Sequence, residues 1–291
     1  MKKSFRGGTL NKGVDLIREM KKNKCSFKVV TGGQSKKILF QDEGGTYKKT
    51  TYYGNKKKEH LHGVFMCNLV KKDIDNYLLK KKPIPATKEK PSLLLYNFKE
   101  IERLCSSEKR EMSYAIDINS CYFQTAYNLG FISNKTFDRG WKDRDIYKYG
   151  ILASIGTLNK REVVEEYKDG ELITREYEEE NYNKYSPFYW AIINEVYRIM
   201  IETARLLGDD FCMWLTDCAV FKRGREKDLE KLLNDNHYSY KNFRVEFERV
   251  DKRKIYWYDF GKAKEKYINY HKRCGFEPDL IIVGDEENKT S

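Results

Sequence analysis

The sequence predicts an α+β protein with an antiparallel sheet and helices on one face of that sheet. Short segments rich in valine, threonine and tyrosine are interspersed with longer amphipathic segments of helical period. Some of the strand segments are separated by tight turns, which is typical of antiparallel hairpins. Apolar residues make up 40% of the 291 residues, which is sufficient to bury a core.

The first 92 residues are predicted to form a small, basic, β-rich region. The segments SFKVVTGG, KKILFQDEGG, TYKKTTYYG and HGVFMCNLV combine β-branched and aromatic residues with glycines, which predicts short strands and turns. The proline- and lysine-rich stretch 80–92 is typical of a domain boundary. We therefore expect one domain over 1–92 and a second over 93–291.

The elements of 93–291 follow from periodicity, caps and turn signals. The helix that follows the strand YAIDIN has Asn119 or Ser120 as its N-cap. Asp169-Gly170 predicts a hairpin turn, and Gly208 ends a long amphipathic helix that begins at Pro187. In chain order we expect a helix (93–107), a strand (114–119), a helix (120–131), a polar connector (131–147), a helix (148–158), a hairpin (161–180), a helix (187–208), a hairpin (211–222), a helix (225–236) and two strands (240–260).

The charge is distributed unevenly along the chain. Residues 1–90 carry 23 Lys and Arg against 8 Asp and Glu, whereas the remainder carries 33 against 36. A polycationic first third favours contact with a polyanion, most simply nucleic acid. The alternative is codon bias, because richness in Lys, Asn and Tyr is typical of a low-GC bacterium, or of a phage or mobile element within one.

The sequence gives no indication of a membrane or an oxidising compartment. No apolar run approaches the roughly 18–20 residues of a membrane span, and MKKSFRGGTL lacks the apolar stretch of a signal peptide. The seven cysteines include no C-x-x-C pair, which argues against a zinc ribbon or a disulfide scaffold. We expect a cytoplasmic protein with no membrane partner.

Asp117 and Asp217 share a sequence context. Each follows an apolar segment, and neither has an obvious basic partner within four residues. A buried carboxylate is costly unless a salt bridge, a hydrogen-bonded turn or a metal ion compensates it. If both acids lie on neighbouring strands, their oxygens converge and repel unless a cation lies between them, and Mg²⁺ suits such oxygen ligands. Alternatively, each aspartate caps a turn or a helix.

Five segments resemble, in the same order, the palm motifs of family B DNA polymerases. DINSCYFQ (117–124) resembles the first motif, DxxSLYPS, and KYGILASIG (148–156) resembles the second, KxxxNSxYG. YWAIINEVYRIMIETARLL (189–207) resembles the helix that carries A-x-x-IT-x-x-GR. WLTDCAVFK (214–222) resembles the third motif, YGDTDSVF, and KIY (254–256) matches the K-x-Y signature. The resemblance covers about residues 110–260 and implies an antiparallel polymerase palm.

The resemblance implies a two-ion catalytic site. Asp117, Asp217 and the backbone carbonyl of Ile118 would hold two Mg²⁺ or Mn²⁺ ions. Ser120 and Tyr122 would contact the incoming nucleotide, with Tyr122 beneath its sugar. The alternative for Tyr122 is simple packing in the first turn of a helix.

The resemblance also implies contacts to phosphates and to the primer strand. Lys148 would bind the incoming triphosphate. Because the fingers-like connector (123–150) is short for this family, Arg139, Lys142 and Arg144 are expected to substitute as phosphate contacts. Lys254 and Tyr256 would grip the primer strand; the alternatives are an exposed strand lysine and a core tyrosine.

Two further residues have smaller predicted roles. Arg6 lies in SFRGG, which faintly resembles a Y-x-GG primer-template contact motif, although a flexible glycine turn is the alternative. Arg198, at the arginine position of the helix before the third motif, is expected to brace the palm and not to react.

The chain departs from the family pattern at several positions. Leu215 replaces the first acid of the third motif, and Leu152, Ala153 and Ile155 replace the Asn, Ser and Tyr of the second. The short connector predicts loose nucleotide selection. No D-x-E exonuclease motif precedes residue 110, so we expect no proofreading.

The sequence therefore predicts a minimal nucleotidyltransferase of the DNA polymerase B type. It would use dNTPs and a DNA primer-template to extend a nucleic-acid 3′ primer, or a protein hydroxyl, with a replication partner subunit supplying missing parts. The alternative is a catalytically decayed palm that binds nucleic acid or serves as a replication accessory, which Leu215 favours. Reverse transcriptase fits less well, because Cys218 and not a second aspartate follows Asp217.

Overall fold

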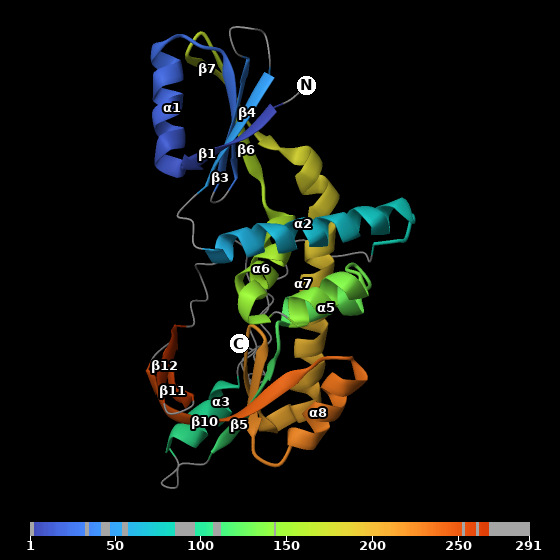
Figure 1. Ribbon diagram of the computed structural model, residues 1–291. Helices are drawn as coiled ribbons and strands as arrows, with labels where there is room; N and C mark the ends of the chain where they lie inside the picture. The colour runs from blue at the N-terminus through green and yellow to red at the C-terminus, as the bar shows by residue number, and fades with distance from the viewer. Residues whose placement is uncertain are drawn as a thin grey trace, which may run out of the picture. The chain divides into compact units, whose positions relative to one another are not determined.

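The chain forms two compact units, each assembled from separate parts of the sequence (Figure 1). The computed structural model describes residues 3–32, 35–41, 47–53, 58–84, 97–106, 112–142, 144–251, 254–259 and 262–267. The first unit comprises Met1–Ile84 and Phe131–Tyr189, and the second comprises Pro85–Gly130 and Trp190–Ser291. Two of the three divisions therefore lie inside the region 93–291, which was expected to form one domain.

The first unit is built on a six-stranded sheet. Its elements are β1 (Lys3–Thr9), α1 (Leu10–Lys22), β2 (Phe27–Gly32), β3 (Ser35–Gln41), β4 (Tyr47–Tyr53), α2 (Lys58–Leu79), α5 (Asn134–Lys142), α6 (Arg144–Gly156), η1 (Thr157–Asn159), β6 (Glu162–Lys168), β7 (Glu171–Glu178) and the first part of α7 (Glu179–Leu207). The strand order is β1-β4-β3-β2-β6-β7. β1 and β4 run parallel, and the other neighbouring pairs are antiparallel.

Helix α1 covers one face of this sheet (Figure 1). Its Met20 packs with Phe27, Val29 and Ile38, which alternate along β2 and β3 and therefore share a face. Phe27 also stacks on Tyr167 of β6 with ring centroids 4.5 Å apart. Through this contact, β6, a strand from the middle of the chain, contributes to the core beneath the N-terminal sheet.

The β6–β7 hairpin confirms the predicted turn at Asp169-Gly170. Both residues have positive φ, 52° and 80° respectively, as tight hairpin turns require. The Gly170 amide donates to the carbonyl oxygen of Cys25 at 2.9 Å, and a Cβ at Gly170 would collide with the Lys21 carbonyl oxygen. The turn therefore docks against the end of α1.

The prediction of a strand for HGVFMCNLV is wrong, because this segment lies inside α2. Met66, Val70 and Ile74 follow one another at four-residue intervals, and all three are fully buried. That interval places them on one face of a helix, whereas strand alternation would have divided them between two faces. The region 1–92 is therefore not purely β-rich.

The prediction of a polar connector over 131–147 is also wrong, because this segment is largely helical. It contains α5 and the start of α6, and both helices pack against α2. Phe131 packs edge-on against Tyr77 and Phe188, with ring centroids 5.3 and 4.9 Å apart. These aromatic contacts anchor the segment within the first unit.

The second unit is built on a separate, fully antiparallel sheet. Its elements are α3 (Phe98–Ser106), β5 (Ser113–Ile118), α4 (Cys121–Asn128), the remainder of α7, η2 (Gly208–Asp210), β8 (Phe211–Leu215), β9 (Cys218–Lys222), α8 (Glu226–Asp235), β10 (Tyr240–Asp251), β11 (Lys254–Asp259) and β12 (Lys262–Tyr267). The strand order is β12-β11-β10-β5-β9-β8. The α+β class is confirmed, and the elements predicted for this unit occur in the predicted order. β12 was not predicted, and α7 begins at Glu179 and runs through Pro187.

Helices cover both faces of the second sheet, which corrects the expectation of helices on one face. Ile116 and Ile118 of β5 pack with residues of α7 and α8, whereas Ala115 packs with Ile101 and Leu104 of α3. Strand alternation explains this division, because neighbouring residues point to opposite faces. Asp117 has the parity of Ala115 and lies on the α3 face.

Within the described part of the chain, no helix is long and apolar enough to cross a membrane. Six of the seven cysteines are described, and all six are free thiols. They are Cys25, Cys67, Cys105, Cys121, Cys212 and Cys218.

Replacing Gly170 by alanine should destabilise the first unit by about 1–3 kcal/mol, because the new Cβ meets the Lys21 carbonyl at a positive φ. Gly156→Ala is the matched control, since Gly156 has a helical φ of −59° and open space at its Cβ position. It should be neutral or stabilise by about 0.4–1 kcal/mol. Urea unfolding of both variants gives the comparison, and equal effects would contradict the docked hairpin.

Candidate functional site

Asp117 and Asp217 are brought together at the ends of adjacent strands. Asp117 is the penultimate residue of β5 and pairs with Cys218, the first residue of β9. Asp217 lies in the turn between β8 and β9, directly before Cys218. The Ile118 amide donates to the Asp217 carbonyl oxygen at 2.8 Å, which ties the two acidic segments together. The predicted convergence of these acids is therefore present in the structure.

Unusual backbone conformations lie beside both acids. Thr216 has a φ of 59°, and the Asp217 amide donates to the Leu215 carbonyl oxygen at 2.6 Å, which closes a tight three-residue turn. Such a turn is rare and strained at a β-branched residue. Trp214 holds it, because its indole Nε1 donates to the Thr216 carbonyl oxygen at 2.9 Å. Ser120, three residues after Asp117, also has a left-handed φ of 47°.

The environment of Asp217 disfavours its charged form. Burial raises the pKa of Asp217 to about 6, and the neighbouring Asp117 carboxylate adds to this effect through repulsion and a hydrogen bond to the protonated form. Lys241 opposes the increase. Cys121 is 2% exposed and lies close enough to interact electrostatically with both acids. Burial raises the pKa of its thiol, so the side chain beside the two carboxylates is uncharged.

Lys241 is the cation that meets Asp117 in the structure. Its Nζ lies 2.6 Å from Oδ2 of Asp117, and the two residues occupy paired positions on β10 and β5. The Asp117 side chain is 19% exposed and that of Lys241 is 56% exposed. Of the three compensations considered for Asp117, the salt bridge is therefore observed, and it leaves two carboxylates sharing one monovalent cation.

The donor set fits a hard divalent ion in part. Among the described residues, no group of three or more His, Cys, Asp and Glu side chains is arranged to hold a metal. The candidate side-chain ligands are therefore the two carboxylates. Mg²⁺ is commonly held by one or two carboxylates, with waters and substrate phosphates completing its shell. The raised pKa of Asp217 indicates that this pair lacks positive charge, which such an ion supplies.

Three other predicted residues lie close in sequence to Asp117. Ile118 ends β5, and Ser120 is the N-cap of α4 without a side-chain capping hydrogen bond. Tyr122, in the first turn of α4, is half-buried and packs against the cluster formed with α7 and α8. The packing role considered for Tyr122 is therefore observed.

Lys254 and Tyr256 lie far along the sheet from the acids. Tyr256 of β11 pairs with Arg249 of β10, eight positions beyond Lys241, the residue opposite Asp117. At the usual rise of a strand this separation is about 26 Å. The Arg249 guanidinium lies 4.2 Å from the centroid of the Tyr256 ring. Lys254 begins β11, and its side chain lies outside the described part of the structure.

The remaining predicted residues belong to the first unit, whereas the acids belong to the second. Lys148 is exposed on α6. Arg144 begins α6 and Arg6 lies on β1, and the side chains of both are outside the described part of the structure. The fold of a single unit does not bring these three residues to the acids.

The basic character of the N-terminal region is partly neutralised. The β6–β7 segment 162–178 carries seven acidic and two basic residues, and it joins the N-terminal sheet. Lys28 pairs with Glu166 at 2.7 Å, and Lys37 pairs with Glu162 at 3.0 Å. Part of the positive charge expected to face a polyanion is therefore used within the fold.

Arg198 is a structural brace, as the sequence predicted. Its guanidinium donates to Glu195 and Glu202 at 2.6 Å on its own helix. It also donates to Asn236 at 2.7 Å, which ties α7 to the end of α8.

Lys241 is the site residue that sequence reasoning missed. It lies 124 positions after Asp117, and only the register of β10 against β5 brings them together. A lysine at the start of a predicted strand was the available signal, but it identifies no partner.

No protein-family model matches the sequence, and neither a curated protein nor a solved structure matches the chain.

Asp217→Asn should stabilise the protein at neutral pH. Because the folded pKa of about 6 lies above the ordinary 3.8, the folded state holds a proton between about pH 4 and 6 that the unfolded chain has lost. Ionised Asp217 thus destabilises the fold above pH 6. The variant should gain on the order of 1–3 kcal/mol there and lose this advantage below about pH 4.

Asp210→Asn is the matched control for this pH dependence. Asp210 lies 2.9 Å from Arg225 and 3.5 Å from Lys222, so its neutralisation should cost up to about 1 kcal/mol at neutral pH. Urea unfolding with EDTA present measures both variants without interference from divalent ions. Destabilisation by Asp217→Asn at neutral pH, or a difference independent of pH, would contradict the account of the site.

Proposed function

We propose that this chain is a metal-dependent nucleotidyltransferase of the DNA polymerase B type. It extends a nucleic-acid 3′ primer, or a protein hydroxyl, with dNTPs and without proofreading. The observation that carries the proposal is the meeting of Asp117 and Asp217, one hundred positions apart, at the ends of adjacent strands, where burial and mutual repulsion raise the pKa of Asp217. An antiparallel sheet with acids at neighbouring strand ends is also what the resemblance to a polymerase palm requires.

In this proposal Asp117, Asp217 and the Ile118 carbonyl hold two Mg²⁺ or Mn²⁺ ions. When bound, such ions lower the pKa of an attacking hydroxyl and stabilise charge on the transferred phosphoryl group. The strained turn at Thr216 and the indole of Trp214 fix the backbone of Asp217, so its carboxylate is held in place before substrate arrives.

The other predicted residues bind substrate. Ser120 and Tyr122 orient the sugar of the incoming nucleotide, Lys148 and Arg144 contact its phosphates, and Arg6 contacts the primer-template.

Lys254 and Tyr256 contact the primer strand upstream of its reacting end. The β10 residue that pairs with Tyr256 lies about 26 Å along the strand from the position opposite Asp117, which corresponds to roughly seven or eight base pairs of a duplex, and Lys254 pairs two positions further along β10. The contact therefore stabilises the bound duplex and does not align the 3′ hydroxyl.

A catalytically decayed nucleic-acid-binding or replication-accessory protein is the second candidate. Two observations favour it. Lys241 already neutralises Asp117, and Leu215 replaces an acid with an apolar side chain that packs against the cluster beneath α3. In this alternative the acids are a remnant and the salt bridge is structural.

The cellular setting completes the proposal. The free thiols of the described cysteines suit a reducing, cytoplasmic compartment. A replication partner subunit would supply contacts that a short connector cannot provide.

Primer extension with labelled dNTPs and Mn²⁺ tests the proposed activity. Asp117→Asn and Asp217→Asn should each reduce incorporation by about a thousandfold or more, because each removes a charge that holds the ions. Asp210→Asn, which neutralises an acid in a structural ion pair of the same unit, should retain activity within about threefold.

Two results of this assay would contradict the proposal. Incorporation that survives either site substitution would show that other residues carry the reaction. Wild-type protein that binds primer-template but incorporates nothing on any template would favour the decayed palm.

Lys241→Gln should increase the affinity for Mn²⁺ by about fivefold, because it removes a competing cation worth on the order of 1 kcal/mol. Lys231→Gln is the matched control, since Lys231 also lies 2.6 Å from a carboxylate, that of Asp235 on α8. Calorimetric titration with Mn²⁺ measures both variants. Equal affinities in the two would mean that Lys241 does not compete for the site.

A further inference from the structure

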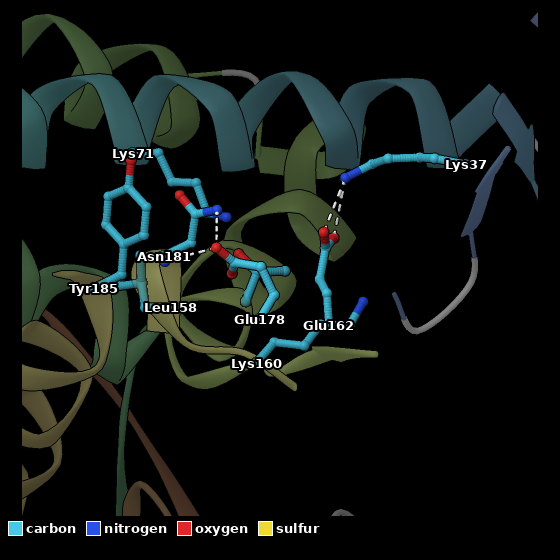
Figure 2. Close-up of a pocket in the computed structure, with 9 residues that line it drawn as sticks. Lys37, Lys71, Leu158, Lys160, Glu162, Glu178, Asn181 and Tyr185 are labelled. Carbon is cyan, nitrogen blue, oxygen red and sulfur yellow. Dashed lines mark hydrogen bonds and ion pairs between the residues drawn. The ribbon is translucent and has the colours of Figure 1, made fainter. Parts of the chain in front are cut away.

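The first unit contains a small cavity at the junction of its sheet and its helices (Figure 2). Its volume is about 200 Å³. The residues that line it are Lys37 of β3, Lys71 of α2, Thr157 and Leu158 of η1, Lys160, Glu162 of β6, Glu178 at the end of β7, and Asn181 and Tyr185 of α7. Three lysines from separate elements therefore converge on one cavity.

Only one of these lysines has its charge neutralised at the cavity. Lys37 contacts both carboxylate oxygens of Glu162, at 3.0 and 3.2 Å. Within the described part of the chain, Lys71 and Lys160 form no ion pair, and Figure 2 shows none between them and the residues drawn. Their ammonium groups are available to an anion that enters the cavity.

The charged form of Lys160 is disfavoured where it stands. Burial lowers the pKa of Lys160, and repulsion by Lys37 and Lys71 adds to this effect, whereas Glu162 opposes it. A bound anion would oppose both causes, because its attraction favours the charged form of Lys160. The half-buried Lys160 thus has too little negative charge around it to favour its charged form. The acids of the second unit likewise have too little positive charge around them.

The other polar groups at the cavity are already engaged. Glu178 accepts hydrogen bonds from the backbone and side-chain nitrogens of Asn181, at 3.0 and 2.9 Å, which caps the first turn of α7. The Tyr185 hydroxyl donates to Asp75 at 2.9 Å, and its ring lies 5.0 Å from the Lys71 ammonium. These contacts fix the walls and leave Lys71 and Lys160 as the free donors.

We propose that this cavity binds a phosphoryl group. Lysine ammonium groups bind phosphate oxygens as point charges, and the ammonium groups of Lys71 and Lys160 at a single small space suit a compact anion. The volume lies below the roughly 300–1,000 Å³ of pockets that enclose a whole ligand. The cavity therefore holds one phosphate, while the rest of the ligand stays outside.

Two kinds of ligand carry such a phosphate. It is either the terminal phosphate of a free nucleotide or the backbone phosphate of a single-stranded nucleic acid. The proposal does not depend on Asp117 or Asp217, because every lining residue belongs to the first unit.

Calorimetric titration in EDTA tests the proposal, since EDTA removes divalent ions from the acids. The probes are inorganic phosphate, dTTP, and a short oligothymidylate with hydroxyl ends. The double variant Lys71→Gln with Lys160→Gln should weaken binding of at least one probe by about tenfold. Lys28→Gln, a single-charge control in the ion pair with Glu166 outside the cavity, should change it less than about twofold.

The three probes distinguish the sources. Cavity-dependent binding of phosphate and dTTP alone identifies a terminal phosphate, and cavity-dependent binding of the oligothymidylate identifies a backbone phosphate. The proposal is overturned if no probe binds, or if the double variant loses no more affinity than Lys28→Gln for any probe.

A measurement on the wild-type protein removes dependence on the folding of variants. Acetic anhydride labels deprotonated lysines, so Lys160 should react faster than an exposed lysine, and inorganic phosphate should protect it. Mass spectrometry reports the extent of labelling at each position. Labelling of Lys160 that phosphate leaves unchanged would also overturn the proposal.

Discussion

The repulsion between Asp117 and Asp217 is the interaction on which the site depends. Two carboxylates at adjacent strand ends, near a buried and uncharged Cys121, repel one another, and ionisation of Asp217 is therefore unfavourable without a compensating cation. The fold nevertheless forces the encounter through the Ile118 to Asp217 backbone hydrogen bond and the strained turn at Thr216. Lys241 relieves part of the repulsion from the neighbouring strand. Stability is thus traded for a site that attracts positive charge, and such strain is typical of functional sites.

How far the sequence predicts this site depends on the range of each contact. The two acids could be proposed as a pair in advance, because each follows an apolar segment and neither has a basic partner within four residues. Lys241 could not, because its contact depends on the register between strands more than one hundred residues apart. The face covered by α3 was missed for a related reason. The pattern of Ala115, Ile116 and Ile118 is compatible with burial on both sides, but it does not say which helix covers each side.

The first unit shows the same limit at a larger scale. Its strands β2, β3 and β4 were predictable from local composition, whereas the apolar run around Met66 was assigned to a strand although Met66, Val70 and Ile74 have helical spacing. The incorporation of β6 and β7 into the N-terminal sheet is a long-range pairing. The opposite charges of the two regions are consistent with this pairing, and Lys28 pairs with Glu166 and Lys37 with Glu162. Composition alone, however, does not identify which residues pair. Each unit thus contains a group whose charged form is disfavoured by burial, Asp217 in the second unit and Lys160 in the first.

The most direct test of the central claim is the pKa of the Asp217 carboxyl group, measured by carbon NMR in EDTA. The account predicts a value near 6 in the wild-type protein, and a lower value in Asp117→Asn because the like charge is removed. Saturating Mg²⁺ should also lower it in the wild type. An ordinary value near 3.8 in the wild type, unchanged by Asp117→Asn and by Mg²⁺, would contradict the account, because the two carboxylates would then not share a site.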